Sequence, residues 1–341
     1  PQAQPIEEMI VTDSSLDRVV RPVFLTFQGR LDDGEPFAHM VPDALLVSSL
    51  LERAEALGVA LLMPERVEAF ETGAVATTVR LGSGREIRTR LLVAADGARS
   101  RLRDLAGIQV VRFDYGQSGI VTTLAHERPH EGRAEEHFLP SGPFAVLPLT
   151  DDAAGRHRSS LVWSEKTEIA DRLVGGDDFT FGLELERRFG HHLGKVEVLA
   201  KPKAFPLGLT LAREFVRPRF ALVGDAAHGI HPIAGQGLNI GLRDVAALAE
   251  EIVEARRIGL DPGGIEVLER YQRARRFDAV EMGVVTDGLN RLFSNDLAAL
   301  RALRDVGLGL VDRVGGLKAH FIREAAGVGA GVPRLLRGEA I

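Results

Sequence analysis

Two short apolar segments, far apart in the chain, constrain the fold most strongly. Residues 91–95 (LLVAA) and 219–223 (RFALV) are typical of strands that are buried on both faces in a parallel sheet. The first stops at Asp96-Gly97 and the second at Gly224-Asp225, and a helical pattern follows each pair. Ligands of open α/β sheets bind beyond the carboxyl ends of the strands. We therefore expect the two turns to face one cleft.

A glycine-rich run follows the second turn. Gly235-Gln236-Gly237 lets the backbone approach a ligand without interference from Cβ atoms, and the next helix begins with unpaired N–H groups. That helix end carries about half a positive charge, which favours an anion or a ring that becomes anionic when it is reduced. The carboxylate of Asp225 would repel phosphate but can accept hydrogen bonds from ribityl or sugar hydroxyls. A polyol joined to an electron-accepting ring describes a flavin.

The remaining pattern mixes strands and helices. Strands are expected at 6–12, 21–28, 119–125, 144–149, 159–164 and 195–199, and a hairpin at 75–81 and 86–90. Helices are expected at 43–56, at 177–189 and from Gly237 to about 256, where Leu238, Leu242, Val245, Leu248, Ala249 and Ile252 recur at helical spacing. Residues 265–323 read as helical, broken at Asp287-Gly288 and Gly315-Gly316. These elements predict a mixed α/β class.

Composition narrows the possible functions. The 341 residues, 45% of them hydrophobic, are enough for two domains or for one large domain with an insertion. A net charge of −6 argues against chain-wide attraction to nucleic acid. The chain has no cysteine, which excludes disulfides, thiol nucleophiles and Fe–S clusters. No apolar run of about 18 residues is present, and we expect a cytoplasmic protein.

The two turns resemble the paired DG and GD motifs of FAD-dependent aromatic monooxygenases with the para-hydroxybenzoate hydroxylase fold. Residues 96–100 (DGARS) are similar to the first motif, and 224–228 (GDAAH), continued by 231–239 (HPIAGQGLN), are similar to the second. Together with 144–149 (FAVLPL), 161–163 (LVW) and 286–293 (TDGLNRLF), they most resemble the ubiquinone-biosynthesis hydroxylases.

The resemblance implies a Rossmann-like FAD/NAD(P)-binding flavin domain, incomplete at its N-terminus, with a β-sheet substrate domain and C-terminal helices. The expected division is 1–38 for substrate-domain strands, 39–108 and 205–256 for the FAD-binding domain, 109–204 for the β-rich substrate domain, and 257–341 for the helical region. The family opens with a strand, a G-x-G-x-x-G loop and a helix that bind the ADP half of FAD, and this sequence contains no such motif. We expect that a segment preceding Pro1 is missing.

The resemblance also implies residue roles. Asp225 would bind the ribityl chain, the N–H groups of 235–239 would hold the pyrimidine edge of the flavin, and Pro232 would line the face where substrate meets flavin. Asp96 and Arg99 would lie near the pyrophosphate, where the family also handles NAD(P)H. The implied cofactor-binding residues are Asp96, Gly97, Arg99, Gly224, Asp225, Ala226, Pro232, Ala234, Gly235, Gln236, Gly237, Leu238 and Asn239.

A substrate cavity is implied as well. Its expected lining is Leu147, Pro148, Trp163 and Pro232, although Trp163 lies on an alternating strand, which favours a packing role over a place in the cavity. No catalytic side chain is assigned, because the chemistry belongs to the cofactor. The implied reaction uses NAD(P)H to reduce FAD and O2 to hydroxylate a phenolic ring, with a polyprenylated ubiquinone precursor as the substrate. The alternatives are hydroxylation of another small aromatic, or a flavin-free lipid-binding or assembly component.

Two further patterns bear on metals and partners. His228 and His231 are three residues apart, but no third ligand is near, so turn or core histidines are favoured and no metal is expected. Basic residues alternate with apolar ones in 301–337, which favours either peripheral docking on anionic lipid at the inner membrane face or a solvated face of a packed helix. The expected partners are the aromatic substrate and other enzymes of ubiquinone synthesis.

Overall fold

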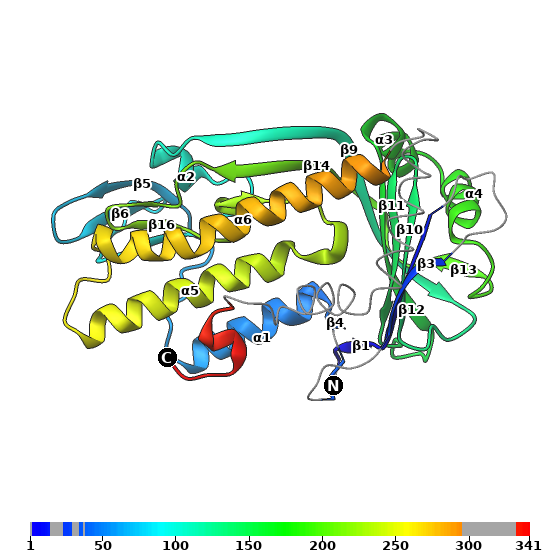
Figure 1. Cartoon of the computed structure of the whole chain (residues 1–341), viewed down its shortest axis with the longest axis horizontal. Helices are drawn as coiled ribbons and strands as arrows, with labels where there is room; N and C mark the ends of the chain where they lie inside the picture. Colours follow the sequence, from blue (N-terminus) through cyan, green and yellow to red (C-terminus); the bar gives the residue numbers. More distant parts are fainter. Residues whose placement is uncertain (1, 14–22, 29–33, 37, 295–331) are drawn as a thin grey trace. The chain divides into compact units, whose positions relative to one another are not determined.

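A computed structural model describes residues 2–13, 23–28, 34–36, 38–294 and 332–341. The chain forms two compact units, each built from discontinuous stretches (Figure 1). Unit 1 comprises Pro1–Val59, Gly116–Leu207 and Leu289–Ala326, and unit 2 comprises Ala60–Tyr115, Gly208–Gly288 and Gly327–Ile341. Helices and strands are both abundant, so the predicted mixed α/β class is confirmed.

Unit 1 is built on a large mixed sheet. From β9 onward, its strands are, in spatial order, β9 (Val110–His126), β12 (His157–Lys166), β11 (Gly142–Leu149), β10 (Arg133–Leu139), β2 (Glu8–Asp13) and β3 (Val23–Gln28). The pairing of β10 with β2 is parallel, whereas the other neighbours are antiparallel. The shorter strand β13 (Val196–Val198) pairs with β9, and β1 (Gln4–Ile6) pairs with β4 (Ala38–Met40). Helix α1 (Asp43–Ala56) also belongs to this unit.

The two faces of the unit 1 sheet differ in burial, because successive residues of a strand point to opposite faces. Helices α3 (Thr167–Gly175) and α4 (Asp178–Phe189) pack on one face, where Ile120, Leu161 and Trp163 are fully buried. The other face is only partly covered. It carries the alternate residues Val121, Ala145, Leu147, Ser160 and Val162, all of which retain some solvent exposure.

Unit 2 contains two small sheets and the longest helices. The antiparallel sheet consists of β5 (Val67–Thr72), β6 (Thr77–Leu81) and β7 (Glu86–Thr89), and the second sheet is ordered β15 (Val216–Arg217), β16 (Phe220–Leu222) and β8 (Leu92–Ala94). Strand β14 (Lys203–Ala212) pairs with β17 (His228–Gly229), and α2 (Arg101–Leu105) is a short helix. The long helices α5 (Gly237–Arg257) and α6 (Ile265–Phe293) lie side by side (Figure 1), joined by the Arg270–Glu251 ion pair at 2.6 Å. Single 3-10 turns are η1 (Gly224–Ala226), η2 (Ile233–Gly235) and η3 (Arg334–Arg337).

Helix α6 corrects one prediction. The sequence predicted a break at Asp287-Gly288, but α6 runs without interruption to Phe293. A glycine inside a helix costs only about 1 kcal/mol, and tertiary contacts beyond it offset that cost. Phe293 stacks on Phe138 at 4.1 Å, and the amide of Asn290 donates to Gln117 at 3.0 Å. The second predicted break, Gly315-Gly316, lies outside the described residues.

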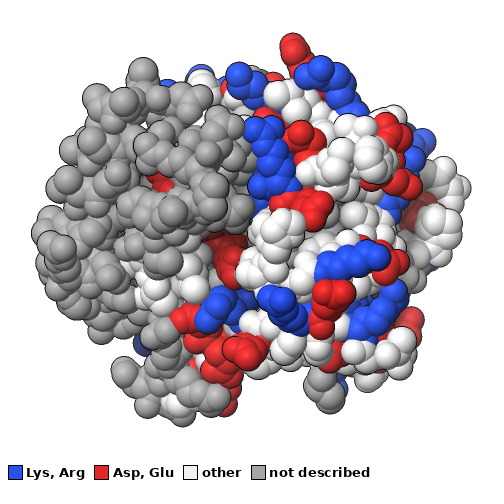
Figure 2. Space-filling view, turned by 90° about the vertical axis from the view of Figure 1, so that its right-hand side faces the viewer, with Lys and Arg blue, Asp and Glu red and all other residues white. Residues whose placement is uncertain are grey.

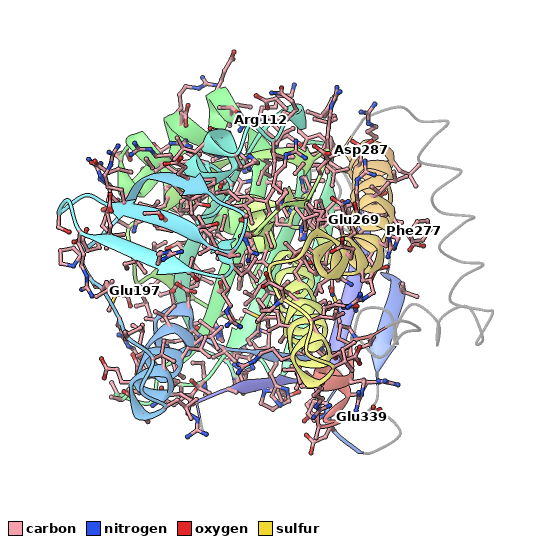
Figure 3. All side chains as sticks on the ribbon, turned by 90° about the vertical axis from the view of Figure 1, so that its left-hand side faces the viewer. Arg112, Glu197, Glu269, Phe277, Asp287 and Glu339 are labelled. Carbon is pink, nitrogen blue, oxygen red and sulfur yellow. The ribbon has the colours of Figure 1, made fainter. Side chains whose placement is uncertain are left out.

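The surface carries mixed charge. In Figure 2, Lys and Arg alternate with Asp and Glu over the described part of the face that is shown, so that part offers no extended basic surface to a polyanion. On the outer side of α6, Glu269 and Phe277 lie at the surface (Figure 3), and Phe277 is 70% exposed. Among the described residues, no helix is both long and apolar enough to cross a bilayer.

Candidate functional site in unit 2

The two predicted turns lie at one edge of the same sheet. Strands β8 and β16 are parallel and directly paired, with Ala94 opposite Leu222. The ladder continues past both strands, because the N–H of Val223 donates to the carbonyl of Ala94 at 3.0 Å. Asp96-Gly97 and Gly224-Asp225 therefore leave the sheet at the same carboxyl edge, where ligands of α/β folds bind.

Asp96 is engaged by its own turn. Its carboxylate accepts the hydroxyl of Ser100 at 2.5 Å and the N–H of Leu102 at 3.0 Å. The Ser100 hydroxyl in turn accepts the N–H of Arg103 at 3.0 Å and so caps α2. Asp96 therefore shapes the turn, whereas the exposed Arg99 has no partner in the described part of the chain and can contact a ligand. Gly97 has a φ of +80°, a conformation that favours glycine.

Arg103 joins the two turns, a role that the sequence did not reveal. Its side chain is fully buried, and its guanidinium donates to the carbonyls of Ala226 at 3.0 Å and Ala98 at 3.3 Å. A buried guanidinium is costly unless its N–H groups are paired. The pairing here fixes the first turn against the second. Arginines alternate with other residues at 99, 101 and 103, so no pattern singled out the buried one.

The second turn presents an unpaired carboxylate. Gly224 has a φ of +59° and begins the 3-10 turn η1, and its N–H donates to Asp244 at 2.9 Å. Ala226 and Ala227 are fully buried beneath it. Asp225 is exposed, and its carboxylate has no partner among the described residues. A rigid turn thus carries an acceptor that is free to bind hydroxyl groups of a ligand.

Asp244 on α5 anchors this turn from below. Its buried carboxylate accepts the N–H of Gly224, His228 Nε2 at 2.6 Å and Arg275 Nε at 2.9 Å. The Tyr271 hydroxyl, also on α6, donates to the carbonyl of Leu222 at 2.6 Å. The turn is therefore held by both long helices.

Only part of the apolar pattern of α5 faces the interior, where Leu248 is buried. Leu238, Leu242 and Val245 are exposed, whereas Arg243 and Asp244 lie on the buried face. The apolar residues recur at the expected helical spacing, but Asp244 and its hydrogen-bond partners occupy part of the buried face of α5.

The start of α5 is bare. Gly235 has a φ of +62°, and an added Cβ at Gly235 or at Gly237 would meet no atom within 4 Å. No side-chain hydrogen bond caps the helix, so the N–H groups of its first turn are available to a ligand. Four residues further on, a Cβ at Gly241 would lie 3.2 Å from the Cα of Gly224. This close approach brings the helix against the Asp225 turn.

The two histidines of the motif are buried. His228 is bound to Asp244, and burial lowers the pKa of His231 to about 4. His231 Nδ1 accepts the N–H of Ile233 at 3.3 Å, its ring packs edge-on against Tyr115 at 5.3 Å, and its Nε2 has no partner in the described structure. Within the described residues, no group of three or more His, Cys, Asp and Glu could hold a metal ion.

The predicted substrate-lining residues of unit 1 lie on different faces of its sheet. Leu147 is half-buried on the partly open face, and Pro148, next along β11, is buried on the face that packs against α3 and α4. Trp163 is fully buried on that packed face, between Phe144 and Phe181, with the guanidinium of Arg188 4.3 Å from its ring centroid. Its surroundings are those of a core residue.

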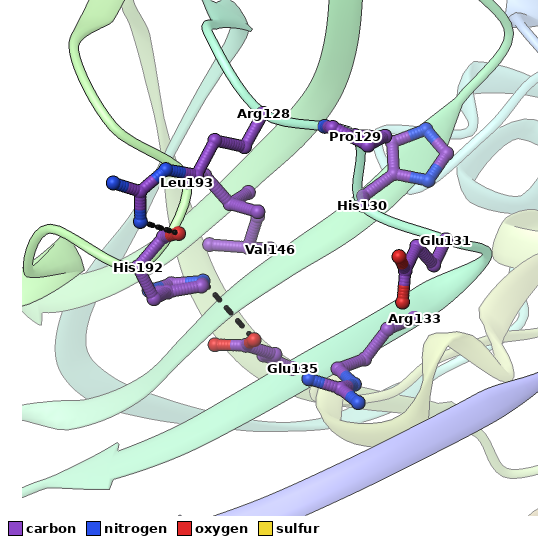
Figure 4. A pocket seen from close by; sticks show the side chains of 9 residues that line it. All are labelled: Arg128, Pro129, His130, Glu131, Arg133, Glu135, Val146, His192 and Leu193. Atoms are coloured by element: carbon purple, nitrogen blue, oxygen red, sulfur yellow. Dashed lines mark hydrogen bonds and ion pairs between the residues drawn. The ribbon is translucent and has the colours of Figure 1, made fainter.

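A separate pocket of about 320 Å³ lies within unit 1 (Figure 4). Its charged groups largely pair with each other or with neighbours. His192 lies 3.1 Å from Glu135, Arg128 donates to the carbonyl of His192 at 3.1 Å, and Arg133 is paired with Glu8 at 2.6 Å. This pocket lacks the bare backbone and the uncapped helix start of the unit 2 site.

Comparison with known proteins agrees with the geometry. A family model described as an FAD binding domain matches residues 13–283. The ubiquinone hydroxylase UbiL of Rhodospirillum rubrum is 45% identical over 341 residues, covering 99% of this chain and 77% of that protein. The 3-demethoxyubiquinol 3-hydroxylase of Escherichia coli is 37% identical, covering 85% and 73%. The mouse ubiquinone biosynthesis monooxygenase COQ6 is 38% identical, covering 73% of this chain and 58% of that protein.

Solved structures share the fold. Pseudomonas aeruginosa PqsL, in complex with 2-aminobenzoylacetate, superposes with a TM-score of 0.73 at 24% identity, covering 90% of this chain and 81% of that chain. The p-nitrophenol 4-monooxygenase PnpA of Pseudomonas putida gives 0.72 at 19% identity, covering 96% and 82%. With the family match over most of the chain, the resemblance seen in the sequence is confirmed. The chain belongs to the FAD-binding-domain family of FAD-dependent monooxygenases, which includes the hydroxylases of ubiquinone biosynthesis.

Proposed function

We propose that this protein hydroxylates the phenolic ring of a polyprenylated ubiquinone precursor, with FAD as cofactor and NAD(P)H and O2 as co-substrates. The 45% identity with a ubiquinone hydroxylase supports the substrate class. In the overall reaction, an aromatic C–H, O2, NAD(P)H and a proton give an aromatic C–OH, water and NAD(P)+. The observation that carries the proposal is the unpartnered carboxylate of Asp225 beside the uncapped start of α5.

These residues fit a flavin. Asp225 would accept hydrogen bonds from ribityl hydroxyls, and the N–H groups of 237–239 would donate to the pyrimidine edge. The positive end of α5 would stabilise negative charge on the reduced ring. When bound, FAD supplies electron transfer from the nicotinamide to oxygen; the protein supplies position and exclusion of water.

Unit 2 is then the flavin-binding part, and the partly open sheet face of unit 1 is the substrate side. Asp96 would orient its turn through Ser100 and Leu102, which leaves Arg99 to meet the phosphates of the cofactor or of NAD(P)H. In the described residues, β8 has a neighbouring strand, β16, on one side only, so its other edge can pair with a further strand. Both features suit a dinucleotide.

Membrane contact through 301–337 remains part of the proposal. Residues 301–331 lie outside the described residues. Of the rest, Arg334 approaches Glu254 at 3.9 Å and Glu339 at 3.6 Å, so this basic group is already paired. Flotation with anionic vesicles tests the contact, and a protein that stays at the bottom of the gradient contradicts it. Association with other enzymes of ubiquinone synthesis is likewise part of the proposal.

The function is tested with purified protein, FAD, NADH or NADPH, 18O2 and two substrates, 2-prenylphenol and phenol. Mass spectrometry of the prenylated product should show one 18O atom. Hydroxylation of phenol alone would favour a hydroxylase of another small aromatic. A protein that neither retains FAD nor oxidises NAD(P)H with either substrate would favour the flavin-free lipid-binding or assembly alternative.

A further inference from the structure

Glu136 on β10 is a buried carboxylate without a partner. Its side chain is 6% exposed, and no hydrogen bond or ion pair within the described structure involves it. Burial alone raises the pKa of this carboxyl group to about 7. An ionisable group in such surroundings is costly to keep, and groups of this kind concentrate at functional sites.

The strand register places Glu136 on the partly open face of the unit 1 sheet. It lies opposite Val11 of β2 and Ala145 of β11. Phe138, two residues along the same strand, points to the same face and stacks on Phe293 at the end of α6. Toward β2 and β3, this face is closed by the small cluster of Val11, Leu25, Phe138 and Phe293.

Toward β11, β12 and β9, the described residues leave the same face partly exposed. Ala145, Leu147 and Val162 are half-buried, and Val121 is 37% exposed. Since the side chains around it are mostly small or apolar, this part can take up an aromatic ring. Glu136 stands where the closed part meets the open part.

Few other charges share this face. Asp13 on β2, opposite Phe138, is the nearest ionisable group in register, and Arg291 lies on the α6 end that packs there. The opposite face of β10 provides a contrast. There, Glu135 is paired with His192 at 3.1 Å (Figure 4), and His137 binds the Thr12 hydroxyl at 2.6 Å. Glu136 is thus the carboxylate of β10 that has no partner in the described structure.

We propose that Glu136 contacts the phenolic hydroxyl of the aromatic substrate, first accepting its hydrogen bond and then its proton. This role rests on the proposed function. The O–H bond of the phenol breaks, its electron pair stays on oxygen, and the proton forms a neutral carboxylic acid on Glu136. The phenolate enriches the ring in electrons at the carbon to be hydroxylated. After hydroxylation, Glu136 returns the proton to the phenolate oxygen of the product.

The test compares Glu136→Gln with Glu135→Gln, a matched change on the opposite face of the same strand. We expect Glu136→Gln to lower the rate of 2-prenylphenol hydroxylation by about 100-fold or more, the contribution of a positioned proton acceptor. NAD(P)H oxidation should continue, yielding hydrogen peroxide in place of product. The wild-type rate should rise with pH near 7, and this rise should be absent in Glu136→Gln. Glu136→Asp should restore part of the rate, and Glu135→Gln should match the wild type.

A measurement on the wild type alone covers the case in which Glu136→Gln fails to fold. Binding of 2-prenylphenol and of its methyl ether is followed by flavin fluorescence between pH 6 and pH 9. A proton-accepting carboxylate predicts that the phenol binds more tightly than the ether and that this preference changes with pH near 7. An equal and pH-independent affinity would overturn the role of Glu136.

The outcome also separates this inference from the proposed function. A Glu136→Gln enzyme with wild-type coupling and an unchanged pH profile removes the role of Glu136 while the hydroxylase stands. A wild-type protein that oxidises no NAD(P)H with any phenol removes the proposed function itself.

Discussion

Replacing Glu136 with glutamine should stabilise the FAD-free protein at high pH. The pKa of this carboxyl group is about 7 in the folded protein against an ordinary value of 4.5. Each unit of pKa corresponds to about 1.4 kcal/mol, so the ionised side chain costs the fold about 3 kcal/mol. Glutamine has the same shape and never ionises. It should recover that free energy wherever the wild-type side chain would be charged.

The pH dependence has a definite sign. Because the folded-state pKa is raised, the folded protein binds the proton more tightly than the unfolded chain does. The cost is therefore absent below about pH 4.5, grows as the pH rises toward 7 and is constant above. The expected gain of Glu136→Gln in unfolding free energy is about 1 kcal/mol at pH 5 and about 3 kcal/mol at pH 8.

Urea unfolding at these two pH values measures the gain. The FAD-free protein is used so that ligand binding does not add to stability. Glu135→Gln is the control: its carboxylate is 29% exposed and paired with His192, so its loss should change stability by at most about 1 kcal/mol. A Glu136→Gln protein no more stable than the wild type at pH 8, or a gain equal at both pH values, would refute the reasoning.

Four further outcomes are expected. Asp225→Asn should weaken FAD binding about 10- to 100-fold, the worth of hydrogen bonds to a charged acceptor, and leave the melting temperature of the FAD-free protein unchanged; fluorescence titration and thermal melts measure both. Gly241→Ala should destabilise the protein by about 1–3 kcal/mol in urea. Gly237→Ala should stabilise it by up to about 1 kcal/mol yet weaken FAD binding. A Gly237→Ala protein less stable than Gly241→Ala would contradict the packing described. Asp244→Asn should cost about 3–5 kcal/mol in urea, because the buried Arg275 loses one of its two carboxylate partners and the buried His228 loses its own. The pKa of His231 is lowered to about 4, so the stability that depends on its neutral ring is complete above about pH 6.5 and is lost as the pH falls. Between pH 7 and pH 5, the unfolding free energy of His231→Gln should therefore fall by about 2 kcal/mol less than that of the wild type. Equal losses would contradict this.

Local sequence patterns predicted the elements whose cause is local. The helix expected at 43–56 begins and ends at Asp43 and Ala56, with Pro42 at its cap position. The hairpin of β6 and β7 forms around the predicted Gly82-Ser83-Gly84 turn. The adjacent strand ends could also be foreseen, because two apolar strands of a parallel sheet place their carboxyl ends at one edge.

The contacts that hold the site could not be foreseen, because they join distant parts of the chain. Arg103 and Ala226 are bonded across 123 residues, and Asp244 and Arg275 across 31. Strand β10 was not predicted for a related reason. Its sequence, RAEEHFL, is rich in charge and resembles a solvated segment. Pairing on both sides, with β2 and β11, makes it a central strand despite that composition.

Four carboxylates differ in whether the chain itself supplies their hydrogen-bond partners, and this difference suggests which of them support the fold and which bind ligands. Asp96 and Asp244 each accept hydrogen bonds from groups of the chain, and these bonds hold the two turns in place. Asp225 and Glu136 have none in the described structure, although one is exposed and the other is buried. An exposed free carboxylate costs the fold little and suits hydroxyl groups of a cofactor, whereas a buried one destabilises the fold until a ligand donates to it. The protein should therefore gain stability from FAD mainly through unit 2, and bound phenol should relieve a cost that lies in unit 1.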